Sequence, residues 1–156
     1  MAMQSDSNAS PAAFAGADAL AMSSTNALVL IGRILLGWLF LMSGWPKVMS
    51  IAGFTGYLTN LGAPEFLAWP AALAEVLIGV TLILGIATRY MALVTFIYVI
   101  IATALAHRYW TYPAAAQGNQ YNHFLKNIAI MGGSLLLFAT GAGRFSIDAM
   151  MRGRGP

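Results

Sequence analysis

Four long apolar runs occupy most of the sequence and limit its fold more than any other feature. They cover residues 27–45, 68–87, 90–106 and 127–143. A helix of about 20 apolar residues is long enough to cross the ~30 Å hydrocarbon layer of a bilayer. Charged residues make up 8% of the chain, whereas a soluble domain carries about 25%. The sequence therefore predicts an all-α membrane protein, built as an antiparallel bundle of four transmembrane helices.

The segments around these runs complete the predicted organisation. Residues 1–25 are rich in Ala, Ser and Asn and hold no Lys or Arg, so we expect them to be disordered or loosely interfacial. After the first span, apolar residues recur at helical spacing up to Gly62 and Pro64. This pattern predicts a short amphipathic helix in the membrane interface. Residues 26–150 are then one four-helix membrane domain, followed by a basic tail over residues 151–156.

An even number of spans places both chain ends on one side of the membrane. The basic residues on that side are Arg89, Arg144, Arg152 and Arg154, and those on the other side are Lys47, Arg108 and Lys126. Because basic residues near spans favour the cytoplasm, the small excess predicts cytoplasmic termini.

The composition excludes several kinds of chemistry. The chain has no cysteine, so it can form no disulfide, thiolate nucleophile or iron–sulfur cluster of its own. Its two histidines, His107 and His123, are too few for a transition-metal site made by the protein alone, and no metal site is predicted. The net charge of +3 is explained by membrane-flanking basic residues, so no nucleic-acid partner is predicted.

Two charged residues lie inside predicted spans, Arg33 in the first and Glu75 in the second. A lone charge at mid-bilayer costs at least about 2.5–3.5 kcal/mol, so both should face the bundle interior. Counting residues from the span ends places their levels roughly 10 Å apart. We therefore expect an Arg33–Glu75 pair, direct or bridged by water, Asn127 or Tyr98. Such a pair is either structural or part of a functional site.

Further polar residues gather at the end of the bundle opposite the termini. Lys47 follows the first span, His107 ends the third and Asn127 opens the fourth, so the three lie at one level. The group also includes three other basic residues, Arg108, His123 and Lys126. A mouth of this kind above Glu75 suits an anionic or quinone-like head group. Lys47 and Asn127 are then ligand-binding candidates, and Glu75 and His107 are proton-handling candidates.

In order and spacing, these elements resemble the DoxX family of small four-span bacterial membrane proteins, over about residues 26–150. The matching features are Arg33, Ser43-Gly44-Trp45-Pro46-Lys47, Glu75 with Gly79, His107, Phe124-Leu125-Lys126-Asn127 and the tail from Gly141 to Asp148. The resemblance implies a multi-pass inner-membrane protein with a redox role. The recurring polar positions of the family fall on Arg33, Lys47, Glu75, His107 and Asn127, which makes Arg33 a third ligand-binding candidate. Relatives include the quinone-reducing membrane subunit of thiosulfate oxidation, which implies a non-covalently bound quinone.

Three functions remain open at this point. The first is a quinone-linked membrane subunit or partner of a redox enzyme; since the chain holds no redox centre, electrons must come from a partner protein or a bound reductant. The second is a non-catalytic scaffold, or a bundle that binds lipid or a small solute, held together by an Arg33–Glu75 ion pair. The third is an oligomeric transporter. All three have membrane lipid as a partner, and a homo-oligomer is compatible with each.

Overall fold

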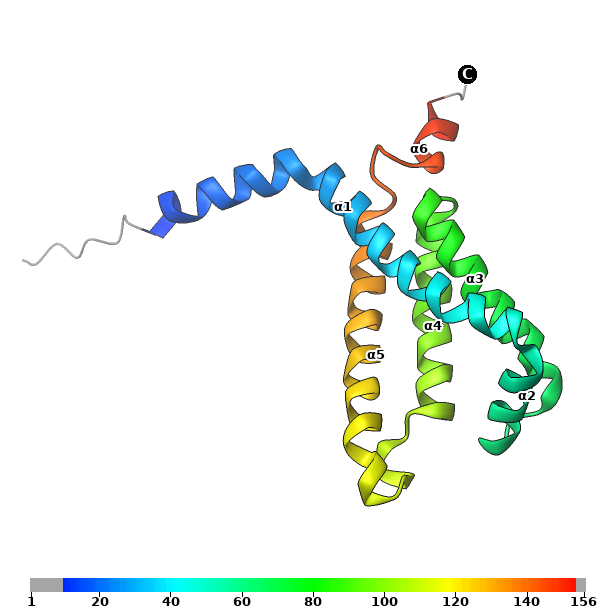
Figure 1. The fold of residues 1–156 in the computed structure, drawn as a ribbon. Helices are drawn as coiled ribbons and strands as arrows, with labels where there is room; N and C mark the ends of the chain where they lie inside the picture. The colour runs from blue at the N-terminus through cyan, green and yellow to red at the C-terminus, as the bar shows by residue number, and fades with distance from the viewer. Residues whose placement is uncertain (1–9, 154–156) are drawn as a thin grey trace, which may run out of the picture.

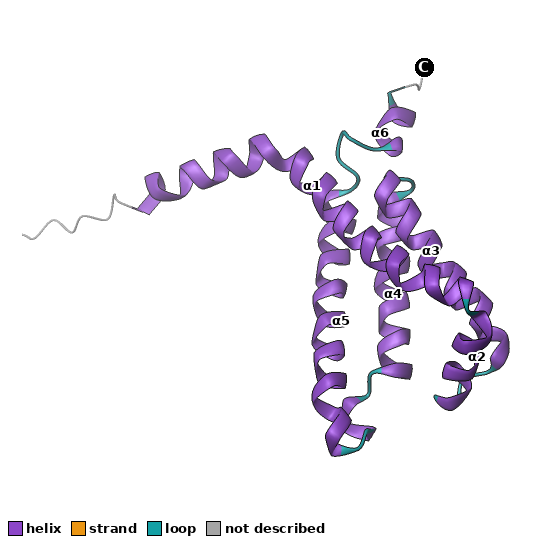
Figure 2. Cartoon of the chain, in the orientation of Figure 1, coloured by secondary structure: helices purple, strands orange, loops and turns teal. Residues whose placement is uncertain are grey.

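The computed structural model describes residues 10–153, which form helices and turns without any β-strand (Figures 1 and 2). The helices are α1 (Ser10–Met49), α2 (Ile51–Asn60), α3 (Ala68–Leu84), α4 (Thr88–Ala106), α5 (Ala114–Thr140) and α6 (Ile147–Arg152), with short 3-10 helices η1 (Glu65–Leu67) and η2 (Tyr109–Thr111). Within the described residues, four helices are long and apolar enough to cross a membrane. The predicted four-span helical fold is confirmed, as is the short helix after the first span.

Helix α1 extends well before the predicted first span. Residues 1–9 lie outside the described residues, but residues 10–25 are helical, so the prediction of disorder is wrong for that part. Residues 15–22 are exposed, and this part of α1 projects away from the bundle (Figure 1). Its small, weakly polar side chains give little hydropathy signal, although Ala is the strongest helix former. The interfacial alternative for this segment stays a prediction.

Helix α5 also starts earlier than the apolar run that predicted it. It begins at Ala114, directly after Pro113, whose fixed φ suits a helix start. The first turns are polar and therefore invisible to a hydropathy search. They are held by aromatic contacts, because Tyr109 packs edge-on against Tyr121 and Phe124 with ring centroids 5.1 and 5.5 Å apart.

The four long helices form two closely packed pairs. Helix α1 packs along α3, and α4 packs along α5, whereas contacts between the pairs are fewer. The apolar core lies where the pairs meet and consists of Phe40, Ile78, Leu82, Ala92, Val99, Ile130 and Leu137. Many large apolar side chains point outward instead, as expected for surfaces that face lipid.

Glycines allow α1 and α3 to approach each other closely. A Cβ atom on Gly37 would lie 2.7 Å from the Gly79 carbonyl oxygen, and one on Gly79 would lie 2.8 Å from the Gly37 carbonyl oxygen. Two turns after Gly37 along α1, a Cβ on Gly44 would lie 2.7 Å from the Cβ of Glu75. Membrane helices commonly associate through small residues in this way. The contact fixes the register of α1 against α3.

The end of the bundle nearest Arg33, here called the terminal end, is tied together by side chains that bind backbone groups. The turn between α3 and α4 needs left-handed backbone at Gly85 (φ +70°) and at Ala87 (φ +48°). The Asp148 carboxylate accepts hydrogen bonds from the amides of Ala87 (2.7 Å) and Thr88 (2.8 Å), so it caps α4. Burial would raise the pKa of Asp148, but these bonds and the charge of Arg152 outweigh it and hold the pKa below its usual value.

Arg33 belongs to this terminal end, and the predicted Arg33–Glu75 pair is wrong. The buried guanidinium donates from Nη1 to the Ala142 carbonyl (2.8 Å) and from Nη2 to the Phe145 carbonyl (2.7 Å). The loop after α5 thus supplies acceptors for both terminal nitrogens of this buried charge, whereas Nε has no hydrogen-bond partner among the described residues. Arg33 therefore holds the C-terminal segment against α1 and forms no polar site with Glu75.

We expect Gly79→Ala to destabilise the bundle by about 1–3 kcal/mol, because the added methyl group would collide with the α1 backbone. Unfolding in detergent micelles by titration with dodecyl sulfate measures the change. The matched control is Gly132→Ala in α5, where a Cβ would meet nothing within 4 Å. Equal stability of the two variants would contradict the close α1–α3 contact.

Arg33→Leu should lower stability by about 2 kcal/mol or more, because it leaves the carbonyls of Ala142 and Phe145 without their donor. Limited proteolysis should also release the segment after α5 faster than in the parent protein. Arg108→Leu, at an exposed position, serves as control. If Arg33→Leu has the stability and the proteolysis rate of the parent protein, Arg33 does not hold the segment after α5 in place.

Candidate ligand-binding site

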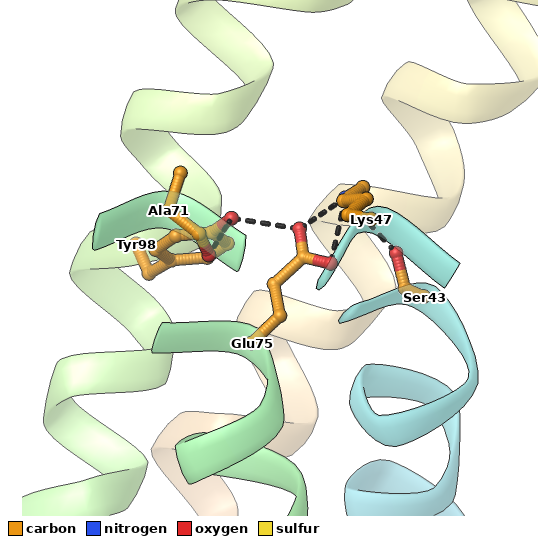
Figure 3. A network of polar contacts seen from close by, with 5 residues as sticks. All are labelled: Ser43, Lys47, Ala71, Glu75 and Tyr98. Atoms are coloured by element: carbon orange, nitrogen blue, oxygen red, sulfur yellow. Dashed lines mark hydrogen bonds and ion pairs between the residues drawn. The ribbon is translucent and has the colours of Figure 1, made fainter. Parts of the chain in front are cut away.

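Lys47, Glu75 and Tyr98 form a hydrogen-bonded cluster at the other end of the bundle, here called the loop end (Figure 3). The Lys47 ammonium donates to both Glu75 carboxylate oxygens, at 2.5 and 2.6 Å, and to the Ser43 hydroxyl at 3.2 Å. The Tyr98 hydroxyl donates to Glu75 Oε1 at 2.7 Å. The Glu75 side chain is only 7% exposed. A carboxylate this deeply buried needs such charged and polar partners.

The path of α1 explains why Lys47, and not Arg33, reaches Glu75. The helix continues through Pro46 to Met49, beyond the predicted end of the span, so Lys47 remains on the helical face that packs on α3. Gly44, one turn earlier, lets the two backbones approach at Glu75. Lys47 also lies in the last turn of α1, where a positive charge is favoured by the helix dipole.

His107 and Asn127 complete the polar lining from α4 and α5. Asn127 is buried and its Nδ2 donates to the Thr103 hydroxyl at 2.8 Å. His107 follows the last residue of α4 and its Nδ1 lies 2.8 Å from Gln120 Oε1, so Nδ1 carries the proton. The ring stacks on His123, with centroids 5.0 Å apart.

These residues surround one cavity of about 390 Å³. Four of the five predicted site residues line it, namely Glu75, His107, Lys47 and Asn127, whereas Arg33 does not. Most of the remaining wall is apolar and comes from the four long helices, from α2, which contributes Phe54, Tyr57 and Leu58, and from Leu61 directly after α2. The predicted interfacial helix is therefore also a wall of this cavity. A cavity of this size suits a small molecule or a head group.

Tyr98 is the site residue that sequence reasoning undervalued. It was expected only as a bridge between Arg33 and Glu75, but it binds Glu75 directly and lines the cavity. A tyrosine in the middle of an apolar span is the available signal, because its buried hydroxyl needs a partner. Ser43, which binds Lys47, gave no comparable signal.

The cluster holds the negative charge of Glu75, and the cavity around it presents hydrogen-bonding groups to an apolar ligand. All three donors of the Lys47 ammonium are engaged, so its charge is balanced by Glu75. Asn127 keeps a second amide proton, and Lys126, which also lines the cavity, keeps donors beyond its contact with His123. Within the described residues, no group of three or more His, Cys, Asp or Glu could hold a metal ion.

Comparison with known proteins places this fold in a family. The sequence profile of the DoxX family matches residues 28–108. The inner membrane protein YphA of Escherichia coli K12 is 36% identical over 123 residues, which cover 78% of this chain and 88% of YphA. The inner membrane protein YqjF of the same organism is also 36% identical over 123 residues, covering 79% of this chain and 91% of YqjF. No solved structure gives a significant match. The profile match and both relatives show that the chain belongs to the DoxX family.

Proposed function

We propose that this protein is an integral inner-membrane protein that binds a quinone head group in the loop-end cavity and serves a redox enzyme as its membrane partner. The observation that carries the proposal is the 390 Å³ apolar cavity with the Lys47–Glu75–Tyr98 cluster on its wall. Its location rests on YphA and YqjF, both of which are inner membrane proteins. Cytoplasmic termini remain part of the proposal.

The lining residues fit a quinone in both polarity and shape. A quinone head group is flat, uncharged and apolar except for carbonyl oxygens, which accept hydrogen bonds. The unused donors of Asn127 and Lys126 suit those oxygens, and the apolar walls suit the ring and its isoprenoid tail. Because Lys47 is neutralised by Glu75, the Lys47–Glu75 pair itself has no net charge and is compatible with an uncharged ligand.

Proton handling would fall to the groups that already share hydrogen bonds. A quinone that is reduced to the quinol takes up two electrons and two protons. The Tyr98 hydroxyl and the Glu75 carboxylate form a donor–acceptor pair on the cavity wall, and His107 lies on the wall toward the exposed loop that follows α4. The Lys47 ammonium, which donates to both Glu75 oxygens, places a positive charge beside that carboxylate. The electrons would come from the partner enzyme or from a bound reductant, since the sequence offers no redox centre of its own.

Ala102→Leu should weaken quinone retention, because the larger side chain occupies part of the cavity that Ala102 lines. We expect about a tenfold loss of quinone per protein molecule with the fold unchanged, measured by mass spectrometry of solvent extracts and by circular dichroism. Ala104→Leu, on the exposed face of the same helix, is the matched control and should retain quinone. If purified parent protein carries no quinone and does not take it up from vesicles, the proposal fails.

A second candidate is a scaffold without turnover, and the Lys47–Glu75 pair favours it in place of the Arg33–Glu75 pair first expected. The pair joins α1 to α3, and Tyr98 adds α4, so the cluster braces three helices.

A double-mutant cycle measures the coupling free energy between Lys47 and Glu75. Lys47→Met should destabilise the bundle by about 3 kcal/mol, because Glu75 keeps a buried charge without its counter-ion. Lys47→Met combined with Glu75→Gln should be more stable than Lys47→Met alone. Arg108→Met, at an exposed position outside the cavity lining, is the control. Purely additive effects would show that the pair is not energetically coupled, and a double variant that folds but no longer binds quinone would favour the redox proposal over the scaffold.

A further inference from the structure

A second cavity, of about 350 Å³, lies at the terminal end of the bundle and shares no lining residue with the loop-end cavity. Its wall includes Arg89 and Tyr90 from the start of α4, and Asp148, Met151 and Arg152 from α6. It therefore combines two guanidinium groups with apolar side chains at one edge of the membrane-spanning region. The sequence alone indicates only that Arg89 and Arg152 are basic residues that flank the spans.

Both guanidinium groups keep donors that the rest of the described chain does not use. Arg89 donates only through Nη1, to the carbonyls of Phe138 (2.5 Å) and Ala139 (2.9 Å), and so caps α5. Arg152 donates only through Nε, to the Asp148 carbonyl at 3.2 Å. Among residues 10–153, the remaining N–H groups of both side chains have no hydrogen-bond partner. Two planar guanidinium groups therefore line the cavity, and most of their N–H groups are free to donate to a ligand.

The one carboxylate on the cavity wall does not cancel these charges. Asp148 is engaged by the Ala87 and Thr88 amides at the start of α4, where the helix dipole also holds it. Two positive groups thus face one negative group, and the cavity keeps an excess positive charge. This balance favours an anion over a zwitterion, because the ammonium group of a zwitterion would be repelled by the arginines.

The apolar part of the cavity carries the kind of exposed side chains expected at a membrane interface. Tyr90 is 77% exposed and lies in the first turn of α4, and Met151 is 56% exposed on α6. Exposed tyrosines at a span end mark the head-group region, and basic pockets next to membrane helices bind anionic lipid head groups. Guanidinium groups bind phosphate oxygens through paired hydrogen bonds.

From this geometry we infer that the terminal-end cavity is a binding site for an anionic glycerophospholipid. Arg89 and Arg152 bind its phosphate, while Tyr90 and Met151 pack against the glycerol and the first part of the acyl chains. The inference is independent of the quinone proposal, since the two cavities have no residue in common.

The test titrates delipidated protein in a neutral detergent with phosphatidylglycerol, and in parallel with phosphatidylcholine, and counts bound lipid by native mass spectrometry. We expect the parent protein to prefer phosphatidylglycerol, and Arg152→Gln to weaken that binding by about tenfold. Arg144→Gln is the matched control, because Arg144 lies close to α6 but does not line the cavity. Arg89→Lys, which keeps the charge but loses the paired donors, should weaken binding without removing the cap on α5.

Three outcomes would overturn the inference. They are equal binding of the two lipids, equal effects of Arg152→Gln and Arg144→Gln, and displacement of phosphatidylglycerol by millimolar inorganic phosphate, which would indicate a soluble phosphate ligand. Quinone content, measured in the same samples, separates this proposal from the previous one. Arg152→Gln should leave quinone content unchanged, and Ala102→Leu should leave lipid binding unchanged.

Discussion

The close contact of α1 with α3 is the constraint on which the rest of the structure depends. Gly37 and Gly79 bring the two backbones together, and Gly44 continues the contact at the level of Glu75. With that register fixed, Lys47 meets the Glu75 carboxylate one turn later. A larger residue at any of these glycines would separate the helices and leave a buried charge without its partner.

The two ends of the bundle use their charges differently. At the terminal end, Arg33, Arg89 and Asp148 bind backbone groups and so hold the C-terminal segment and the helix ends in place. At the loop end, Lys47 and Glu75 bind each other and a tyrosine next to a cavity. Backbone groups that are bonded in this way are fixed parts of the fold, whereas side-chain clusters beside a cavity can exchange partners with a ligand.

Much of the fold could be predicted from the sequence, because four apolar runs and a short amphipathic segment leave few arrangements in a membrane. The level shared by Lys47, His107 and Asn127 also predicted the cavity lining. The pairing of charges could not be predicted in the same way. Residue counting placed Arg33 within reach of Glu75, but it could not show that α1 continues past residue 45 or that the loop after α5 turns back to offer carbonyls to Arg33.

The uneven packing of the long helices has a mechanical consequence. The pair α1 and α3 and the pair α4 and α5 are joined at one end by the three-residue turn from Gly85 to Ala87, which Asp148 braces, and they diverge toward α2 (Figure 1). In such an arrangement the turn is the position of a hinge between the two helix pairs. A small rotation at this hinge would move the far ends of the long helices most. Those ends line the loop-end cavity. Any such rotation would also have to stretch the Tyr98–Glu75 hydrogen bond, which joins the two pairs beside the cavity.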